Sequence, residues 1–350
     1  ARFQGSIRPS YHSHDLISVS MHIFMMERLY FIMLRRVNVI LLPVLWLTDT
    51  KSCVILTVVI ELQMLAGPAT GGVPAGAPFF TPERMMQMPK PFLTYPQQIQ
   101  KLKDKNLTIT DNAAATITLH HYGYFALVSG YKDLFKNPTT KDYRDGTTLD
   151  DIVALYRFDE QLRELTLRYL LQVERHIRSA YSYAFCSQFG ESQNSYLDAN
   201  NYNLMGRINP REVQKLITRH LQPFLSHTTD YPYIEHHKQV HGNVPLWVLI
   251  NALTFGTLSK MYALSQSKIQ AAISKEFVGV REKQLGSMLE VLTKFRNVCA
   301  HNERLFSYNT KNDISDLPLH KKMQIPQNGQ QYIYGKHDYF ALVLSFRYLL

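Results

Sequence analysis

Residues Leu285 to Arg304 read LGSMLEVLTKFRNVCAHNER. Apolar side chains recur in this stretch at intervals of three and four, the spacing of one face of an α-helix. The stretch ends on polar residues that include Arg296 and His301. It therefore predicts a helix that carries an arginine and a histidine to its C-terminal end. The apolar positions are Leu285, Met288, Leu289, Leu292, Phe295 and Cys299.

A second helix is predicted to begin at Asp159 and to stop at Gly190, because glycine commonly ends helices. Arginines occupy the face opposite its apolar stripe. The stripe comprises Leu162, Leu165, Tyr169, Val173, Ile177, Ala180 and Ala184, and the arginines are Arg163, Arg168, Arg175 and Arg178.

Other segments follow the same pattern. Asp111 is placed to cap a helix that follows it. Pro245 to Leu253 is an apolar helical segment, which we expect Gly256 to break. Few segments alternate in the manner of a strand, and no repeat of fixed period occurs. The fold class predicted is all-α, a helical bundle with additional helices.

The composition of the 350 residues is that of a globular protein, with 45% hydrophobic and 19% charged residues. The net charge is +10, of which +8 lies in residues 88–350. A positive excess favours a polyanionic partner, either nucleic acid or an anionic membrane. The three cysteines, Cys53, Cys186 and Cys299, have no spacing typical of a disulfide framework or a zinc ribbon, so a reducing, cytoplasmic location is predicted.

Residues 1–88 differ from the rest. Two apolar runs, Val37 to Thr48 and Cys53 to Leu65, are each shorter than the roughly 20 residues that a membrane-spanning helix needs. A Gly/Pro-rich stretch, residues 67–82, reads as a linker. We interpret residues 1–88 as a non-native or disordered extension of a helical domain, residues 89–350, whose C-terminus is cut short. The alternative is a membrane anchor in residues 30–66, but we predict that the protein does not bind a membrane.

Arg296 and His301 are suited to metal-independent RNA cleavage. Arginine is a permanently charged fork that fits a phosphate, and histidine exchanges protons near neutral pH. Five residues along a regular helix turn the chain by about 140° and advance it by about 7.5 Å, so the two side chains do not share a face. Asn297 and Asn302 can loosen or end the helix there. Two copies of the motif across a two-fold axis would supply a fuller site, which predicts a homodimer.

In such a site a histidine would take the proton of a ribose 2′-hydroxyl, and arginines would stabilise the charged phosphate. No metal and no cofactor is required. DNA lacks that hydroxyl, so the expected partner is RNA. The alternative is that an arginine and a histidine at this common spacing are an ordinary surface pair. His237 and His241 are the best metal-like pair, but they lack a third ligand, and a basic surface patch is the preferred interpretation.

The motif also resembles a known family. RNVCAHNERLF, from Arg296, is similar to the R-N-x-x-A-H-N signature of HEPN domains, and more closely to the abortive-infection AbiD/AbiF-like proteins of bacteria, the Abi-like family. Four blocks precede it in the order of that family, although Gly123 and Ala126 depart from its usual Asn and Arg. The blocks are Lys90 to Ile99, Tyr122 to Tyr131, Tyr156 to Ser179, and Pro245 to Ser259.

This resemblance implies an α-helical HEPN bundle, a part in phage defence, and endoribonuclease activity at a dimeric site. It assigns catalysis to Arg296, Asn297 and His301. For RNA contact we select Arg175, His176, Arg178 and Arg304. For Arg175 and Arg178 the alternative is a structural ion pair with Glu174 or with a neighbouring helix. A neutralising antitoxin, RNA or protein, is a further partner that it allows. The alternative is a non-catalytic module that binds RNA or protein within a defence or toxin–antitoxin system.

Overall fold

The structure is a computed structural model that describes residues 91–205 and 209–350, all of which belong to one compact unit. Within the described residues, regular structure consists of helices and one short antiparallel hairpin, so the all-α prediction is confirmed. The predicted extension, its linker and its two apolar runs lie outside the described residues. No described helix is both long enough and apolar enough to cross a membrane.

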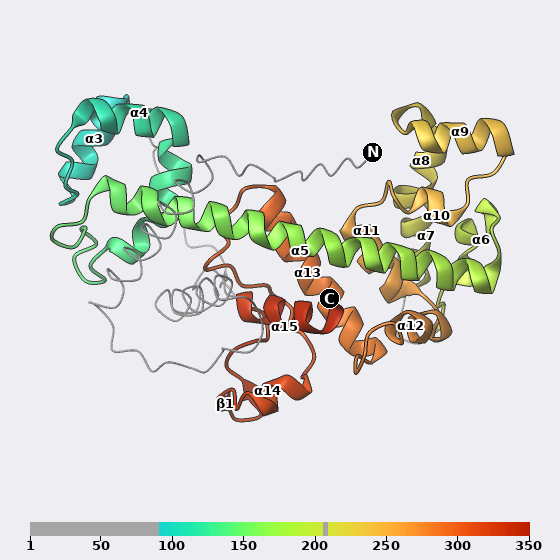
Figure 1. Cartoon of the computed structure of the whole chain (residues 1–350). Helices are drawn as coiled ribbons and strands as arrows, with labels where there is room; N and C mark the ends of the chain where they lie inside the picture. Colours follow the sequence, from blue (N-terminus) through green and yellow to red (C-terminus); the bar gives the residue numbers. More distant parts are fainter. Residues whose placement is uncertain (1–90, 206–208) are drawn as a thin grey trace, which may run out of the picture. The chain divides into compact units, whose positions relative to one another are not determined.

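The elements follow one another along the chain as shown in Figure 1. In the first half they are α3 (Tyr95–Lys103), α4 (Asn112–Tyr122), the π-helix η1 (Phe125–Ser129), the 3-10 helix η2 (Lys132–Phe135), α5 (Leu149–Phe189), α6 (Gln193–Leu197), the 3-10 helix η3 (Ala199–Asn201), α7 (Pro210–Lys215) and the π-helix η4 (Leu216–Leu221). In the second half they are α8 (Gln222–Ser226), the 3-10 helix η5 (Thr228–Asp230), α9 (Pro232–His241), α10 (Leu246–Leu249), α11 (Phe255–Leu264), α12 (Ser267–Ser274), α13 (Glu282–Ala300), α14 (Pro318–Lys322), β1 (Gln327–Asn328), β2 (Gln331–Tyr332) and α15 (Tyr339–Leu349).

Helix α5 begins ten residues earlier than predicted. Thr148 caps it, and the side chain of Asp151 closes a reciprocal capping box with Thr148. The prediction that Asp159 starts this helix was wrong, because Asp159 is fully buried in the middle of α5. The predicted stop was confirmed, since Gly190 ends α5 with a φ of 85°, a conformation that favours glycine.

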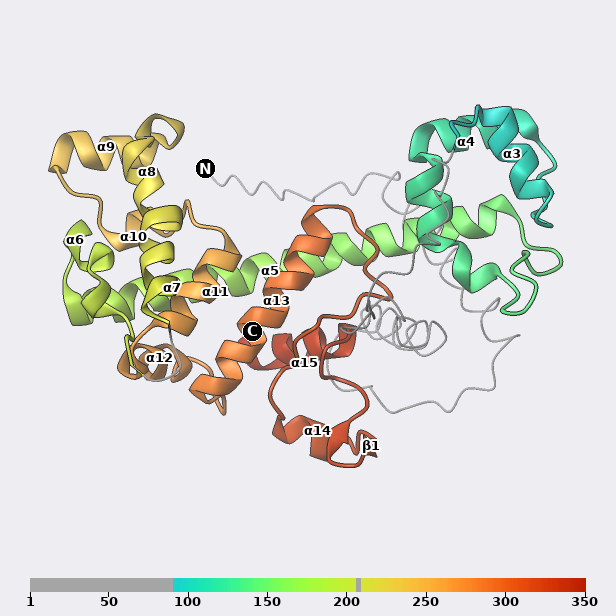
Figure 2. The ribbon, with the colours of Figure 1, turned by 180° about the vertical axis from the view of Figure 1, so that it is seen from behind.

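Helix α5 is the scaffold of the described unit. It contacts η1, α10, α11, α12, α13 and α15, which come from widely separated parts of the sequence. The views in Figure 1 and Figure 2 agree that α13 lies beside the middle of α5, with α15 next to α13. The core is therefore organised around the contact between α5 and α13.

The predicted arginine face of α5 is only partly correct. Arg168 and Arg175 are exposed as expected. Arg163, by contrast, is 3% exposed and points into the unit. Its burial depends on partners in other elements, described below, rather than on the spacing within the helix.

Two other predictions have opposite outcomes. Asp111 caps α4 as expected, accepting hydrogen bonds from the amides of Ala113 and Ala114 at 2.8 and 3.1 Å. Gly256, however, does not break a helix. The chain turns between α10 and α11, and Gly256 lies inside α11, where a Cβ would meet the Thr293 side chain of α13 at 3.4 Å. Gly256 thus lies against α13 within α11.

Candidate functional site

The helix α13 ends at the predicted motif. Ala300 is its last residue and His301 is its C-cap. Asn302 follows with a φ of 56°, in the left-handed region that Asn tolerates well, and the Glu303 amide donates to the Val298 carbonyl at 3.0 Å. This is a Schellman closure. It confirms that Asn302 ends the helix directly after His301.

The segment after the motif is held by one buried carboxylate. Asp159 accepts hydrogen bonds from the amides of Leu305 and Phe306, at 2.9 and 2.7 Å, and from the Tyr131 hydroxyl at 2.8 Å. Arg163 forms an ion pair with it at 2.7 Å. Burial raises the pKa of the Asp159 carboxyl above its ordinary value, whereas these hydrogen bonds and Arg163 oppose the rise. The network fixes the chain after the motif to α5.

Further contacts hold the end of the motif. Asn302 donates from Nδ2 to the Tyr156 hydroxyl at 3.3 Å. Arg304 donates to the carbonyl of Gly130 at 2.5 Å. Arg304, selected above for RNA contact, therefore joins the post-motif segment to the residue after η1.

The arginine of the motif lies against a second buried carboxylate. The Nε atom of Arg296 is 3.8 Å from Oε2 of Glu174, which is 2% exposed and belongs to α5. The other carboxylate oxygen accepts from Arg178 at 2.5 Å, and Arg178 also donates to the Leu253 carbonyl at 2.8 Å. Glu174 thus brings Arg178 and Arg296 together, although they are far apart in the sequence.

The remaining motif side chains face solvent. His301 and Asn297 are exposed, and neither side chain makes a hydrogen bond with the described residues. Arg296 is 31% exposed, and its two Nη atoms likewise make no hydrogen bond within the described ranges. An arginine fork, an amide and an imidazole are therefore available at the closed end of α13.

Arg175 and His176 lie elsewhere on α5. Relative to Glu174 they are rotated by about 100° and about 200° around the helix. His176 packs on Phe277, with ring centroids 4.7 Å apart, in the segment between α12 and α13. Neither residue forms a hydrogen bond, ion pair or ring contact with Arg296 or His301 among the described residues.

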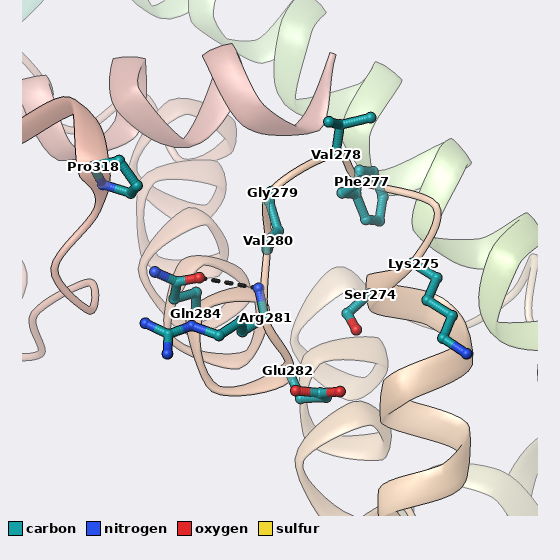
Figure 3. A pocket seen from close by; sticks show the side chains of 10 residues that line it. All are labelled: Ser274, Lys275, Phe277, Val278, Gly279, Val280, Arg281, Glu282, Gln284 and Pro318. Atoms are coloured by element: carbon teal, nitrogen blue, oxygen red, sulfur yellow. Dashed lines mark hydrogen bonds between the residues drawn. The ribbon is translucent and has the colours of Figure 1, made fainter.

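A cavity of about 540 Å³ opens in that same segment, between α12 and the start of α13 (Figure 3). Its lining includes Phe277, Lys275 and Arg281, and the backbone amide of Arg281 donates to Gln284 at 3.0 Å. Helix α13 is about 28 Å long by its rise per residue, so the cavity and His301 lie at its opposite ends. The cavity contains none of the residues predicted for the site.

The histidines of α9 lie close together but do not form a metal site. The rings of His237 and His241 are 5.1 Å apart, and His236 is next to both. Within residues 91–205 and 209–350, no group of three or more His, Cys, Asp or Glu side chains is arranged to hold a metal ion.

Sequence reasoning missed the buried role of Asp159 and the contact of Glu174 with Arg296, although an ion pair of Glu174 with Arg178 was one of its alternatives and is confirmed. Asp159 lies at the predicted start of the amphipathic helix and Glu174 lies within it, and each has an arginine four positions later, Arg163 and Arg178. That spacing is typical of ion pairs on a helix surface, so the sequence gives no reason to expect that these carboxylates are buried. The available signal was their position beside the apolar stripe.

The rate at which the Cys299 thiol is labelled reports how tightly this end of α13 is packed. Burial raises the pKa of its thiol to about 12. Near neutral pH the reactive thiolate is therefore very scarce. We expect iodoacetamide to modify Cys299 at least about 100-fold more slowly in the native protein than in guanidinium chloride, with native labelling rising as pH increases toward 12.

Mass spectrometry of the peptide that contains Cys299 measures this reaction separately from Cys53 and Cys186. Rapid native labelling of Cys299 at neutral pH would show that the end of α13 opens frequently.

Comparison with known proteins gives one family. The family model described as Abi-like protein matches residues 117–307. The match contains Asp159, Glu174, Arg296 and His301, and it ends one residue after the segment that Asp159 anchors. No curated protein and no solved structure matches the chain. Because the match spans more than half of the chain, this protein belongs to the Abi-like family, a membership that points to abortive-infection defence.

Proposed function

We propose that this protein is an abortive-infection effector that cleaves RNA without a metal ion, at a HEPN-type site formed by Arg296, Asn297 and His301. The observation that carries the proposal is the set of polar side chains at the closed end of α13, where Asn297 and His301 have no hydrogen-bond partner among the described residues. Two buried carboxylates of α5 contact this end, Glu174 at Arg296 and Asp159 at the segment after the motif. Such support is what a preorganised site needs. Membership in the Abi-like family supports the defence role.

The chemistry requires only groups that this chain and RNA supply. The imidazole of His301 takes the proton from a ribose 2′-hydroxyl, and the 2′-oxygen attacks the adjacent phosphorus. The bond from phosphorus to the 5′-oxygen breaks, and that oxygen receives a proton from water or from a second histidine. Arg296 stabilises the charge on the phosphate, and Asn297 donates beside it. The products are a 2′,3′-cyclic phosphate and a 5′-hydroxyl.

A homodimer is part of this proposal. One copy supplies a single Arg296 and a single His301, and His301 has no hydrogen-bond partner among the described residues to orient its ring. A second copy across a two-fold axis would double both residues and place polar groups around the exposed imidazoles. A homodimer would thereby complete the site.

A non-catalytic RNA-binding module is the second candidate function. The same unpartnered imidazole favours it, because catalytic histidines are usually oriented by a hydrogen bond to the other ring nitrogen. In that case Arg296, Arg178 and the net charge of +10 would serve RNA binding alone.

Growth arrest separates these functions in cells. We expect induced expression of the full chain to stop bacterial growth and to fragment total RNA. Arg296→Ala and His301→Ala should abolish both effects, because each removes a group needed in the transition state. Lys294→Ala, an exposed charge on the same helix, is the matched control and should remain toxic.

Arrest without RNA fragmentation would favour the binding module. Toxicity that persists in His301→Ala, with fragmented RNA, would contradict the proposed site.

A further inference from the structure

Three buried polar atoms belong to one group of charged side chains on α5 and α13. They are Oε2 of Glu174, Nε of Arg178 and Nε of Arg296, and none has a hydrogen-bond partner among the described residues. Buried polar atoms in folded proteins are nearly always hydrogen-bonded, so each exception needs an explanation. Three buried atoms without a hydrogen-bond partner, all in the group around the Glu174 carboxylate, indicate that this group has a role besides packing.

The geometry of this group is uneven. Glu174 is hydrogen-bonded to Arg178 at 2.5 Å, but its other oxygen is 3.8 Å from Arg296, beyond the range of a direct hydrogen bond. A single carboxylate therefore separates two guanidinium groups, and the group keeps one positive charge in excess. Arg178 is 25% exposed and Arg296 is 31% exposed, whereas Glu174 is buried beneath them.

The outward atoms of both arginines are available. Nη1 of Arg178 and both Nη atoms of Arg296 make no hydrogen bond within the described ranges. Planar guanidinium groups bind phosphate oxygens in pairs of parallel hydrogen bonds. Two such groups fixed side by side suit the phosphodiester backbone of RNA.

We infer that Glu174 is a positioning residue, which holds Arg178 and Arg296 together as a clamp for the RNA backbone. We call Glu174, Arg178 and Arg296 the arginine clamp. This inference rests on the proposed function, in which Arg296 binds the phosphate, and it adds Arg178 as a second phosphate-binding group. Glu174 acts through the two arginines and does not touch RNA.

Positioning and simple charge give opposite expectations for Glu174→Gln. If Glu174 only neutralised the arginines, removal of its negative charge would strengthen RNA binding. If Glu174 positions them, the same change releases two flexible side chains and weakens binding, because the guanidinium groups must then be ordered by RNA itself. The sign of the change decides between the two.

The experiment uses the full chain and a 2′-O-methyl RNA oligonucleotide, which can be bound but offers no 2′-hydroxyl for cleavage. We expect Glu174→Gln to weaken binding about tenfold. Arg178→Gln should lower the slope of log affinity against log salt by about 1, as loss of one phosphate contact does. Glu164→Gln and Arg168→Gln, both exposed on α5, are the matched controls and should leave affinity and slope close to wild type.

Equal or tighter binding by Glu174→Gln, or an unchanged salt slope for Arg178→Gln, would overturn the clamp. If a thermal melt shows that Glu174→Gln does not fold, Arg178→Gln and Arg178→Lys test whether Arg178 binds phosphate. Arg178→Lys should then keep the slope and lose affinity, because lysine retains the charge without the fork. Wild-type protein that binds the probe as expected but never cleaves ordinary RNA would contradict the proposed nuclease and leave the clamp standing.

Discussion

We expect His301→Ala to lower the rate of RNA cleavage by the purified protein at least about 100-fold, the usual contribution of a general acid–base group. RNA affinity should stay within about twofold of wild type, because in the proposed site the arginines, and not the imidazole, hold the phosphate. The replacement should not disturb the fold, because His301 is exposed at the C-cap of α13 and its side chain makes no hydrogen bond with the described residues. The rate and the affinity are measured on the same RNA, with EDTA present throughout.

The matched control is His236→Ala, which removes an exposed histidine from α9. It should cleave RNA at the wild-type rate. A loss of thermal stability in His301→Ala would show that the histidine acts in folding, and cleavage at the wild-type rate would remove it from the mechanism.

Asp159→Ala has the largest effect expected on stability. It leaves the Arg163 charge buried without its partner and exposes the amides of Leu305 and Phe306 to an empty space. Removal of one partner of a buried ion pair costs about 4 kcal/mol of unfolding free energy. Urea denaturation followed by circular dichroism measures this loss. RNA cleavage should fall with it, because the segment after His301 loses its anchor on α5.

Two further variants provide reference values for the loss of unfolding free energy. Tyr131→Phe removes one hydrogen bond to the same carboxylate and should cost about 2 kcal/mol. Glu164→Ala, exposed on α5, should change the unfolding free energy by less than about 0.5 kcal/mol. If Asp159→Ala were as stable as Glu164→Ala, the proposed anchoring of the motif would be incorrect.

Local features of the sequence predicted the end of α13 well. Apolar spacing from Leu285 to Cys299 located the helix, and Asn302 marked its closure, since both depend on neighbouring residues. Gly190 and Asp111 were equally predictable for the same reason. Such signals act within one turn of the chain.

The buried carboxylates could not be predicted in this way. Asp is a frequent helix cap, which made Asp159 resemble a helix start. Its actual partners, Tyr131 and Phe306, lie 28 and 147 positions away in the sequence. Glu174 likewise gains Arg296 only when α13 packs against α5. Because tertiary contacts bring these groups together, no local spacing reveals them.

Product analysis of RNA cleavage by the wild-type protein in EDTA tests whether the protein cuts RNA through the 2′-hydroxyl of its substrate and without a metal ion. A synthetic RNA is cut, its cleavage site is mapped, and the same RNA is prepared with a single 2′-deoxynucleotide on the 5′ side of that bond. We expect cleavage that continues in EDTA, fragments that end in a 2′,3′-cyclic phosphate and begin with a 5′-hydroxyl, and no cut at the deoxy position. Cleavage that requires a divalent metal ion, or that leaves 5′-phosphate and 3′-hydroxyl ends, would contradict it.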